Sequence, residues 1–438
     1  MRSAPAPATR VRPTIVAVEM GYGHLRPAHA LADLLGGDVL KADEPPLAGP
    51  NEQRTWARTR FHYETLTRLS QLPLIGRPLS PLLGVLTSIP PLYPRRDLSN
   101  PTWPVRLVER MASSGLGRGL IDHLRATGTP LLTTFFVHAL IADRAGDLDI
   151  SCVVTDSDIN RVWAPMHPRT TRIRYFAPST RVVRRLIAYG VPTARITLTG
   201  FPLPHELLGG PSLPVAKANL LRRLARLDGD GIFRRHFGDE VERTVGPLPA
   251  ADGPPRVAFA VGGAGAQAEL ADRFLPSLAP VLRAGQLRLL LIAGVRREVA
   301  ERFRRAVDAA GLGACLGDHA AASVSILHEP DLAGYFRAFN RALADVDALW
   351  TKPSELAFFA ALGLGLVFSP AVGEHERRNA RWAMEHGAAL RQHQPEGAAH
   401  WLADWLADGT LAQAAWSGFR SLPKQGLYEI AATFSSTS

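Results

Sequence analysis

The sequence predicts an α/β protein with two doubly wound parallel sheets. β-branched apolar runs alternate with amphipathic helical stretches along most of the chain. A proline- and glycine-rich stretch at residues 246–255 divides this alternation into two similar halves, and glycines follow the first strand of each half. We expect the two units to face each other across a cleft, a common place for a nucleotide and its reaction partner.

Length and composition agree with two globular domains. The chain has 438 residues, of which 46% are hydrophobic and 21% are charged. The formal net charge of +10 suits phosphate-bearing substrates or an anionic membrane face, and an arginine-rich coding bias explains it equally well. The basic residues are scattered and form no stripe with interleaved aromatics, so nucleic-acid binding is not expected.

Targeting signals and cysteines indicate a cytoplasmic protein. Residues 1–12 are a Pro-Ala-rich tail without the apolar segment of a secretory signal. Cys152 and Cys315 lie far apart and predict neither a disulfide nor a zinc site. Residues 72–93 are apolar but contain Arg77 and several prolines, so they cannot form an unbroken spanning helix, although they could lie at a membrane surface.

The first half, residues 13–205, opens with a strand, a glycine turn, a helix and a second strand at residues 14–41. Residues 44–125 interrupt the alternation and are expected to be an insertion that includes one helix at 105–124. Strands are then predicted at 130–136, 150–155, 174–177 and 196–199, with helices at 138–144 and 180–189 between them.

The second half begins after a predicted linker with helices at residues 206–254. Residues 255–410 are expected to form the second sheet, with strands at 257–261, 287–293, 324–328, 346–350 and 364–369. A helix at 356–362 starts after the turn that contains Pro353. Residues 411–438 are a helical segment that could return to the first domain.

Polar residues gather where two strands of the first half end. His24 follows Gly21, Tyr22 and Gly23 at the start of a helix, where it could act as a base or a hydrogen-bond donor. The alternative is a plain tight turn. Asp156 and Asp158 follow the strand at 150–155 and could position a hydroxyl or a cation, although loop-stabilising Asx turns explain them as well.

The second half carries two further constellations. Gly262, Gly263 and Gly265 lie between a strand and a helix, as in an anion-binding nest, but the Lys-Ser/Thr of an ATP-binding P-loop is absent. Glu355, with Glu374, His375, Glu376 and Asn379, could hold sugar hydroxyls, or could simply cap helices. His123, His138 and His167 have no metal-ligand spacing, so no metal site is predicted.

Together these motifs resemble one family. The order is a glycine-His turn, Thr-Asp followed by Trp163, the segment YFAPS, then GFP, a GGxG loop, and finally TKPSE, ALGLGLVFSP and ExxNA. The chain resembles GT-B glycosyltransferases related to monogalactosyldiacylglycerol synthase, the processive diacylglycerol glucosyltransferases and the peptidoglycan GlcNAc transferase. The resemblance spans about residues 16–389, and its carboxyl-terminal motif is the most specific part.

The resemblance implies a site divided between two domains. The second domain would bind a UDP-sugar: Glu355 would hold the ribose, the glycine loop would approach the phosphates, and Glu376 and Asn379 would contact the sugar. His24 and Asp156 would lie near the acceptor hydroxyl, and residues 44–125 would be the acceptor region that touches membranes in lipid-using members. The full expected set is His24 and Asp156 for catalysis; Gly262, Gly263, Gly265, Lys352, Ser354, Glu355, Glu376 and Asn379 for the donor; and Gly21, Tyr22, Gly23 and Trp163 on the acceptor side.

Three positions depart from the family's pattern. The usual KxGPGT loop is shortened to Lys352, Pro353 and Ser354, the usual glutamine is Glu376, and Tyr22 stands where a glycine is common. The predicted function is inverting transfer of a hexose from a nucleotide-sugar to a hydroxyl, with a small-molecule or lipid acceptor and no cofactor or metal. An epimerase of the same fold, which the apolar insertion argues against, and a non-catalytic sugar-nucleotide-binding protein, which the shortened loop favours, are the alternatives.

Overall fold

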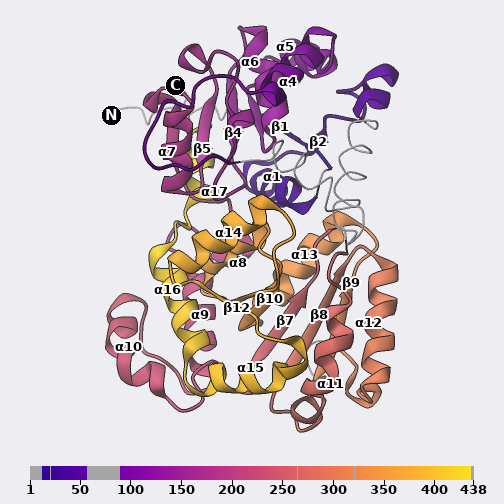
Figure 1. Ribbon diagram of the computed structural model, residues 1–438, viewed down its shortest axis with the longest axis vertical. Coiled ribbons are helices and arrows are strands. Elements are labelled where there is room, and N and C mark those ends of the chain that lie inside the picture. Colours follow the sequence, from indigo (N-terminus) through magenta and orange to yellow (C-terminus); the bar gives the residue numbers. More distant parts are fainter. Residues whose placement is uncertain (1–11, 20, 57–88, 264, 319–321, 436–438) are drawn as a thin grey trace, which may run out of the picture. The chain divides into compact units, whose positions relative to one another are not determined.

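The computed structural model describes residues 12–19, 21–56, 89–263, 265–318 and 322–435 (Figure 1). The chain divides into two compact units, residues 1–203 with 423–438, and residues 204–422. Most of the apolar stretch at residues 72–93, and most of the aromatic residues that precede it, lie outside the described residues.

The first unit contains a six-stranded sheet in which every neighbouring pair is parallel. The strand order is β2-β1-β3-β4-β5-β6. β3 and β4 are buried along their whole length, which explains why their sequences are continuous apolar runs and do not alternate. The strands are β1 (Thr14–Ala17), β2 (Val39–Lys41), β3 (Leu131–Thr133), β4 (Ile150–Val153), β5 (Arg174–Ala177) and β6 (Ile196–Leu198).

Helices surround this sheet (Figure 1). The last helix of the chain packs on the first one, and residues 423–438 belong to the first unit, whereas residues 411–422 of the predicted carboxyl-terminal segment belong to the second. The helices are α1 (Tyr22–Leu35), α4 (Trp103–Ser113), α5 (Arg118–Thr127), α6 (Phe136–Ala145), α7 (Thr180–Ala188) and α17 (Gly426–Ala432), with 3₁₀ turns η1 (Arg161–Trp163), η2 (Pro168–Thr170) and η3 (Thr193–Arg195).

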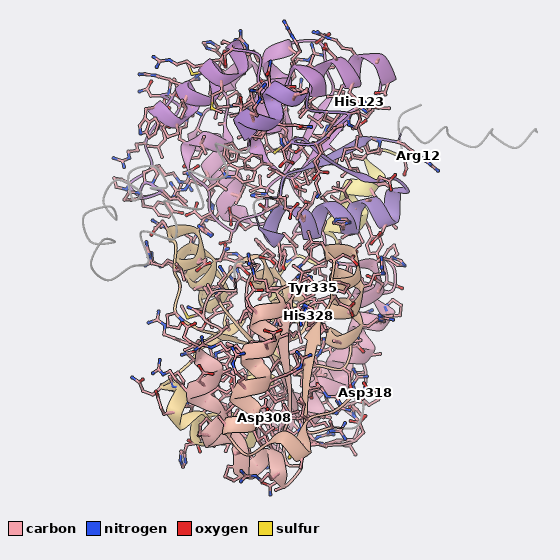
Figure 2. The ribbon with its side chains drawn as sticks, turned by 90° about the vertical axis from the view of Figure 1, so that its right-hand side faces the viewer. Arg12, His123, Asp308, Asp318, His328 and Tyr335 are labelled. Carbon is pink, nitrogen blue, oxygen red and sulfur yellow. The ribbon has the colours of Figure 1, made fainter. Side chains whose placement is uncertain are left out.

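The second unit contains another six-stranded parallel sheet, of order β12-β11-β10-β7-β8-β9. The carboxyl ends of all six strands therefore lie at one edge, and His328, labelled in Figure 2, marks that end of β9. The strands are β7 (Arg256–Ala260), β8 (Arg288–Gly294), β9 (Val324–His328), β10 (Ala348–Thr351), β11 (Gly365–Phe368) and β12 (Ala389–Arg391).

The helices of the second unit include those that the sequence places in a linker. They are α8 (His205–Leu208), α9 (Pro214–Arg226), α10 (Ile232–Thr244), α11 (Leu270–Arg283), α12 (Arg297–Ala309), α13 (Leu332–Leu343), α14 (Glu374–Glu385), α15 (Ala398–Ala407) and α16 (Thr410–Ser421), with 3₁₀ turns η4 (Gly313–Cys315), η5 (Glu355–Leu362) and η6 (Pro395–Gly397).

Arg223 explains why residues 206–254 belong to the second unit and do not behave as a linker. Its guanidinium is buried and donates to the carbonyl oxygens of Leu343, Val346 and Leu362 at 2.7, 2.8 and 2.7 Å. Burial lowers its pKa to about 10, so the group stays charged at neutral pH. A buried charge held by three carbonyls ties α9 firmly to the second sheet.

Two local predictions need correction. Residues 105–124 form two helices, α4 and α5, because Gly115 and Gly117 adopt φ of 101° and 82° between them, in the left-handed region that glycine favours. The helix predicted at residues 356–362 is present, but it is the 3₁₀ helix η5 and begins one residue earlier, at Glu355.

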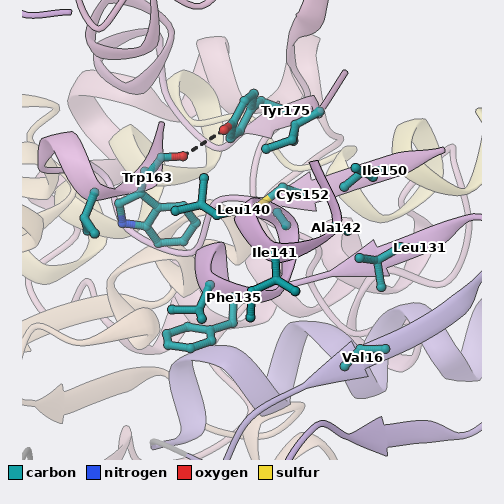
Figure 3. Close-up of a cluster of buried hydrophobic side chains, with 14 of the residues drawn as sticks. Val16, Leu131, Phe135, Leu140, Ile141, Ala142, Ile150, Cys152, Trp163 and Tyr175 are labelled. Atoms are coloured by element: carbon teal, nitrogen blue, oxygen red, sulfur yellow. Dashed lines mark hydrogen bonds between the residues drawn. The ribbon is translucent and has the colours of Figure 1, made fainter. Parts of the chain in front are cut away.

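The core of the first unit packs around the central strands. Val16, Leu131, Ile150, Cys152 and Tyr175 are fully buried (Figure 3). Burial raises the pKa of the Cys152 thiol, and both cysteines are free thiols. Cys152 is therefore a packing residue.

Candidate functional site

In the first unit, the loop after β3 holds His24. The ring nitrogen Nδ1 of His24 lies 2.7 Å from the carbonyl oxygen of Thr134, and the Thr134 hydroxyl donates to the His24 carbonyl at 2.8 Å. A carbonyl only accepts, so Nδ1 carries the proton and Nε2 of the neutral ring has the lone pair. The Phe135 ring packs edge-on at 5.0 Å. The Nδ1 hydrogen bond fixes the tautomer and, together with the aromatic contact, the orientation of the ring, while the Thr134 hydroxyl ties down the His24 backbone.

The glycine turn before His24 is shorter than predicted. α1 begins at Tyr22, so Tyr22, Gly23 and His24 already form its first turn, and Gly21, with φ of 103°, is the residue that reverses the chain. Tyr22 is 9% exposed and packs into the core. The bulk of Tyr22 is therefore accommodated on the inner side of α1.

The two carboxylates after β4 have different surroundings. Asp158 is buried and accepts two hydrogen bonds from Arg185 on α7, at 2.7 and 3.2 Å. Asp156 is half-buried. The hydroxyl of Thr155, the preceding residue, lies 3.3 Å from Nδ1 of His24, so the end of β4 adjoins His24. Asp158 is a structural partner of Arg185, whereas Asp156 stays partly accessible.

Trp163 belongs to the core of the first unit. It is 4% exposed, its ring packs against Phe136 at 5.3 Å, and its carbonyl accepts a hydrogen bond from the Tyr175 hydroxyl at 2.8 Å (Figure 3). The packed Trp163 ring therefore supports the loop that follows β4.

In the second unit, three neighbouring strands bring the predicted donor residues to one edge. β7, β10 and β11 are adjacent and parallel. Their carboxyl ends lead into residues 261–269, 352–354 and 369–373. These loops, with the first turn of η5 and the first two turns of α14, contain Gly262, Gly263, Gly265, Lys352, Ser354, Glu355, Glu376 and Asn379.

The glycine loop is a tight turn that its neighbours hold in place. Gly265 N–H donates to the Gly262 carbonyl at 2.7 Å, and Arg296 Nε donates to the Gly263 carbonyl. Gln267 has a φ of 70°. Its side-chain amide donates a hydrogen bond to the Pro370 carbonyl at 2.6 Å and accepts one from the Ser369 hydroxyl at 2.5 Å. α11 begins at Leu270, so the glycines lie between a strand and a helix, as predicted, and turn residues separate them from the helix.

Arg296 and Gln267 were not predicted as site residues. Arg296 follows β8, and the parallel order alone places that strand end beside β7. The position of Arg296 could therefore have been inferred from the alternating pattern. The left-handed backbone of Gln267 leaves no signal in the sequence, because glutamine is not a residue that favours it.

Lys352 and Glu376 form an ion pair at the centre of the three loops. Lys352 Nζ lies 2.5 Å from Glu376 Oε1, and the Val372 N–H donates to Glu376 Oε2 at 2.7 Å. Glu376 is 2% exposed. Burial alone would raise its pKa, but the charge and hydrogen bond of Lys352, together with the charge of His375, hold the pKa below the usual value. Glu376 is therefore a carboxylate at neutral pH.

The remaining donor residues lie on η5 and α14. Glu355 starts η5 and is 8% exposed. Asn379 is fully buried, and its Nδ2 lies 3.4 Å from the Ser354 carbonyl, which links α14 to the loop after β10. Glu374 pairs with Arg377 and Arg378 at 2.9 and 2.8 Å along its own helix, as expected of a residue that stabilises a helix start.

A metal centre is not apparent in the described part of the chain, where no group of three or more His, Cys, Asp or Glu side chains could hold an ion. His138 is buried in the first unit, with Nδ1 3.0 Å from the Thr133 hydroxyl. Burial, and to a smaller extent His24, lower its pKa to about 3, so it is neutral.

Comparison with known proteins agrees with this architecture. Residues 249–433 match a family described as "Domain of unknown function (DUF6938)". Among curated proteins, the chain is similar to the UDP-N-acetylglucosamine--N-acetylmuramyl-(pentapeptide) pyrophosphoryl-undecaprenol N-acetylglucosamine transferase of Paraburkholderia phymatum, with 32% identity over 193 residues, which cover 42% of this chain and 47% of that protein.

The enzyme of the same name from Xylella fastidiosa is 29% identical over 239 residues, which cover 52% of this chain and 61% of that protein. The chain thus spans about half the length of the curated relatives it matches. Among solved structures, MurG of Acinetobacter baumannii aligns with a TM-score of 0.50 and 15% identity over 97% of this chain and 100% of that chain. These similarities confirm the family resemblance drawn from the motifs and the predicted GT-B fold with two Rossmann-like domains.

Proposed function

We propose that the protein is an inverting glycosyltransferase that moves a hexose from a UDP-sugar to the hydroxyl of a lipid-linked acceptor. The observation behind this proposal is that the predicted donor residues lie at one edge of the second sheet: the glycine loop, Lys352, Glu355 and Glu376. Curated relatives whose names specify a UDP-sugar donor and a pyrophosphoryl-undecaprenol acceptor support it.

The donor would bind to the second unit. Glu355, at the start of η5, would accept hydrogen bonds from both ribose hydroxyls, as acidic residues do in nucleotide-binding folds. The glycine loop at residues 262–265 would let the diphosphate approach the backbone closely, and the Lys352 ammonium would offset its charge. Asn379 and Glu376 would contact the sugar hydroxyls.

The acceptor reaction would use His24. Its Nε2 takes the proton of the acceptor hydroxyl while that oxygen forms a bond to the anomeric carbon. The bond from the anomeric carbon to the phosphate oxygen breaks, and UDP leaves with inversion at carbon. Asp156 is the second candidate for the base, because it follows Thr155, which contacts His24. No cofactor is required, and activity should persist in EDTA.

We further propose that the exposed face of α4 contacts an anionic membrane. Trp103 and Leu107 are 48% and 45% exposed, one helical turn apart, and Arg106 and Arg110 lie on the same face. Tryptophan and leucine with flanking arginines suit the boundary between lipid headgroups and acyl chains. Helices long and apolar enough to span a bilayer are not found among the described residues. The protein would then lie at the inner membrane face.

Calorimetry with UDP, GDP, dTDP and ADP tests the donor site. We expect UDP to bind, and Glu355→Ala to weaken it by at least about tenfold, the size of a lost hydrogen bond to a charged group. Glu301→Ala, which removes an exposed carboxylate paired with Arg297 on α12, is the control and should bind UDP normally. Failure of all four nucleotides to bind would overturn the proposed function.

A further inference from the structure

Lys352 lies directly over the glycine loop. A Cβ atom added to Gly262 would come within 2.4 Å of Lys352 Cε. The alkyl chain of Lys352 therefore passes through the space that a side chain at residue 262 would occupy. This route carries the ammonium group across the loop that is expected to approach the donor phosphates and places it on Glu376.

The carboxylate of Glu376 is fully engaged in this arrangement. Oε1 pairs with Lys352 and Oε2 accepts from the Val372 N–H. The Lys352 side chain is 19% exposed, whereas the Glu376 side chain is 2% exposed. The lysine is thus the more accessible member of the pair, and the carboxylate is buried.

We propose that Glu376 sets the affinity for the donor by competing with its diphosphate for Lys352. This inference rests on the proposed function, because it assumes a diphosphate-bearing ligand at this edge. As the donor binds, its phosphate oxygens take the ammonium from Glu376, and the released carboxylate accepts hydroxyls of the sugar. As UDP leaves, Glu376 recovers Lys352.

The pair accounts for two departures from the family's pattern at once. A lone carboxylate at residue 376 would repel the diphosphate, and the shortened loop at residues 352–354 lacks glycine N–H groups that would hold it. Pairing with Lys352 neutralises the carboxylate until the donor arrives. The ammonium then replaces those missing donors, and the sugar hydroxyls satisfy the released carboxylate. A glutamine at residue 376 would leave Lys352 uncompensated and available to phosphate at all times.

Calorimetry with UDP and uridine on Glu376→Gln, Lys352→Met and the double variant tests this competition. We expect Glu376→Gln to bind UDP about tenfold more tightly and Lys352→Met to bind it about tenfold more weakly, with uridine unchanged in both, since a charged hydrogen bond has about this effect. In the Lys352→Met background no ammonium remains for Glu376 to hold, and only its repulsion of the diphosphate is left, so Glu376→Gln should tighten UDP binding by clearly less than tenfold. Glu396→Gln, which changes the same charge in an exposed pair with Arg273, should leave both ligands unaffected.

The outcomes separate the two proposals. If UDP and uridine bind the wild type but Glu376→Gln binds UDP equally or more weakly, the competition is wrong and the donor site stands. Additive effects in the double variant would also overturn it. If neither ligand binds the wild type, the proposed function falls and the inference falls with it. Melting temperatures and uridine binding identify a misfolded single variant. The double variant, which removes both charges of this pair, then decides.

Discussion

The two units place polar residues at equivalent edges of similar sheets but hold them in different ways. In the first unit, His24 is fixed by a backbone carbonyl, and the loop after β4 is anchored by the buried Asp158–Arg185 pair. In the second unit, the polar side chains pair with one another across three loops, as Lys352 does with Glu376. Rigid anchoring suits a base whose tautomer and direction must be constant, whereas side chains paired with each other can exchange partners with a ligand.

Removal of the anchored base should have the largest effect. We expect His24→Ala to lower the rate of UDP release from a UDP-sugar by about 10²–10⁴-fold, the usual contribution of a general base. UDP binding by calorimetry should be unchanged, because His24 lies in the first unit. An unaltered rate would show that proton transfer does not pass through His24, and Asp156→Asn would then be the variant to measure.

Loss of the buried ion pair should strongly destabilise the first unit. Asp158→Asn leaves the Arg185 guanidinium, 1% exposed, without its counter-charge, and removal of one partner of a buried pair costs about 3–5 kcal/mol. Hydrogen exchange of α7 amides measures the change. Asp147→Asn breaks an exposed pair with Arg125 in the same unit and should cost far less, because solvent screens exposed charges. Equal costs in the two variants would contradict the anchoring role.

The buried His138 should make the first unit sensitive to acid. The folded protein holds its pKa near 3, while an unfolded histidine takes up a proton near its usual 6.5. The contribution of His138 to stability is therefore complete above pH 6.5 and is lost as the pH falls toward 3, at up to about 1.4 kcal/mol per pH unit.

Urea unfolding of wild type and His138→Gln between pH 7 and 4 measures this effect. The difference in unfolding free energy between the two should shrink as the pH falls. His123→Gln, on α5, serves as the control for a substituted histidine in the same unit. A difference that is constant with pH would mean that His138 does not titrate on unfolding.

The smallest effect is expected from Gly262→Ala. The added methyl group displaces the flexible Lys352 side chain, so UDP affinity should fall by about threefold while the melting temperature barely changes. Gly253→Ala, whose methyl group would meet nothing within 4 Å, should affect neither quantity. Unchanged UDP affinity in Gly262→Ala would indicate that the path of Lys352 over the loop is irrelevant to binding.

The sequence by itself determined the fold class and the strand ends at which polar residues gather. Apolar runs such as residues 150–153 and 256–260 are continuous because parallel strands are buried on both faces. Gly115 and Gly117 also signal the break between α4 and α5, although the periodicity of the surrounding residues predicted one helix. The short-range pattern of the sequence is sufficient to predict these features, because the burial and backbone geometry of each residue depend on its own side chain.

Only the tertiary structure decided which of these residues pair. Asp156 and Asp158 are two residues apart in one motif, but only Asp158 meets Arg185. Lys352 lies in the loop after β10 and Glu376 on α14, and nothing in either motif predicts that they neutralise each other. Ion pairs and hydrogen bonds depend on distances of about 3 Å between atoms far apart in sequence. Those distances are set by the packing of whole strands and helices.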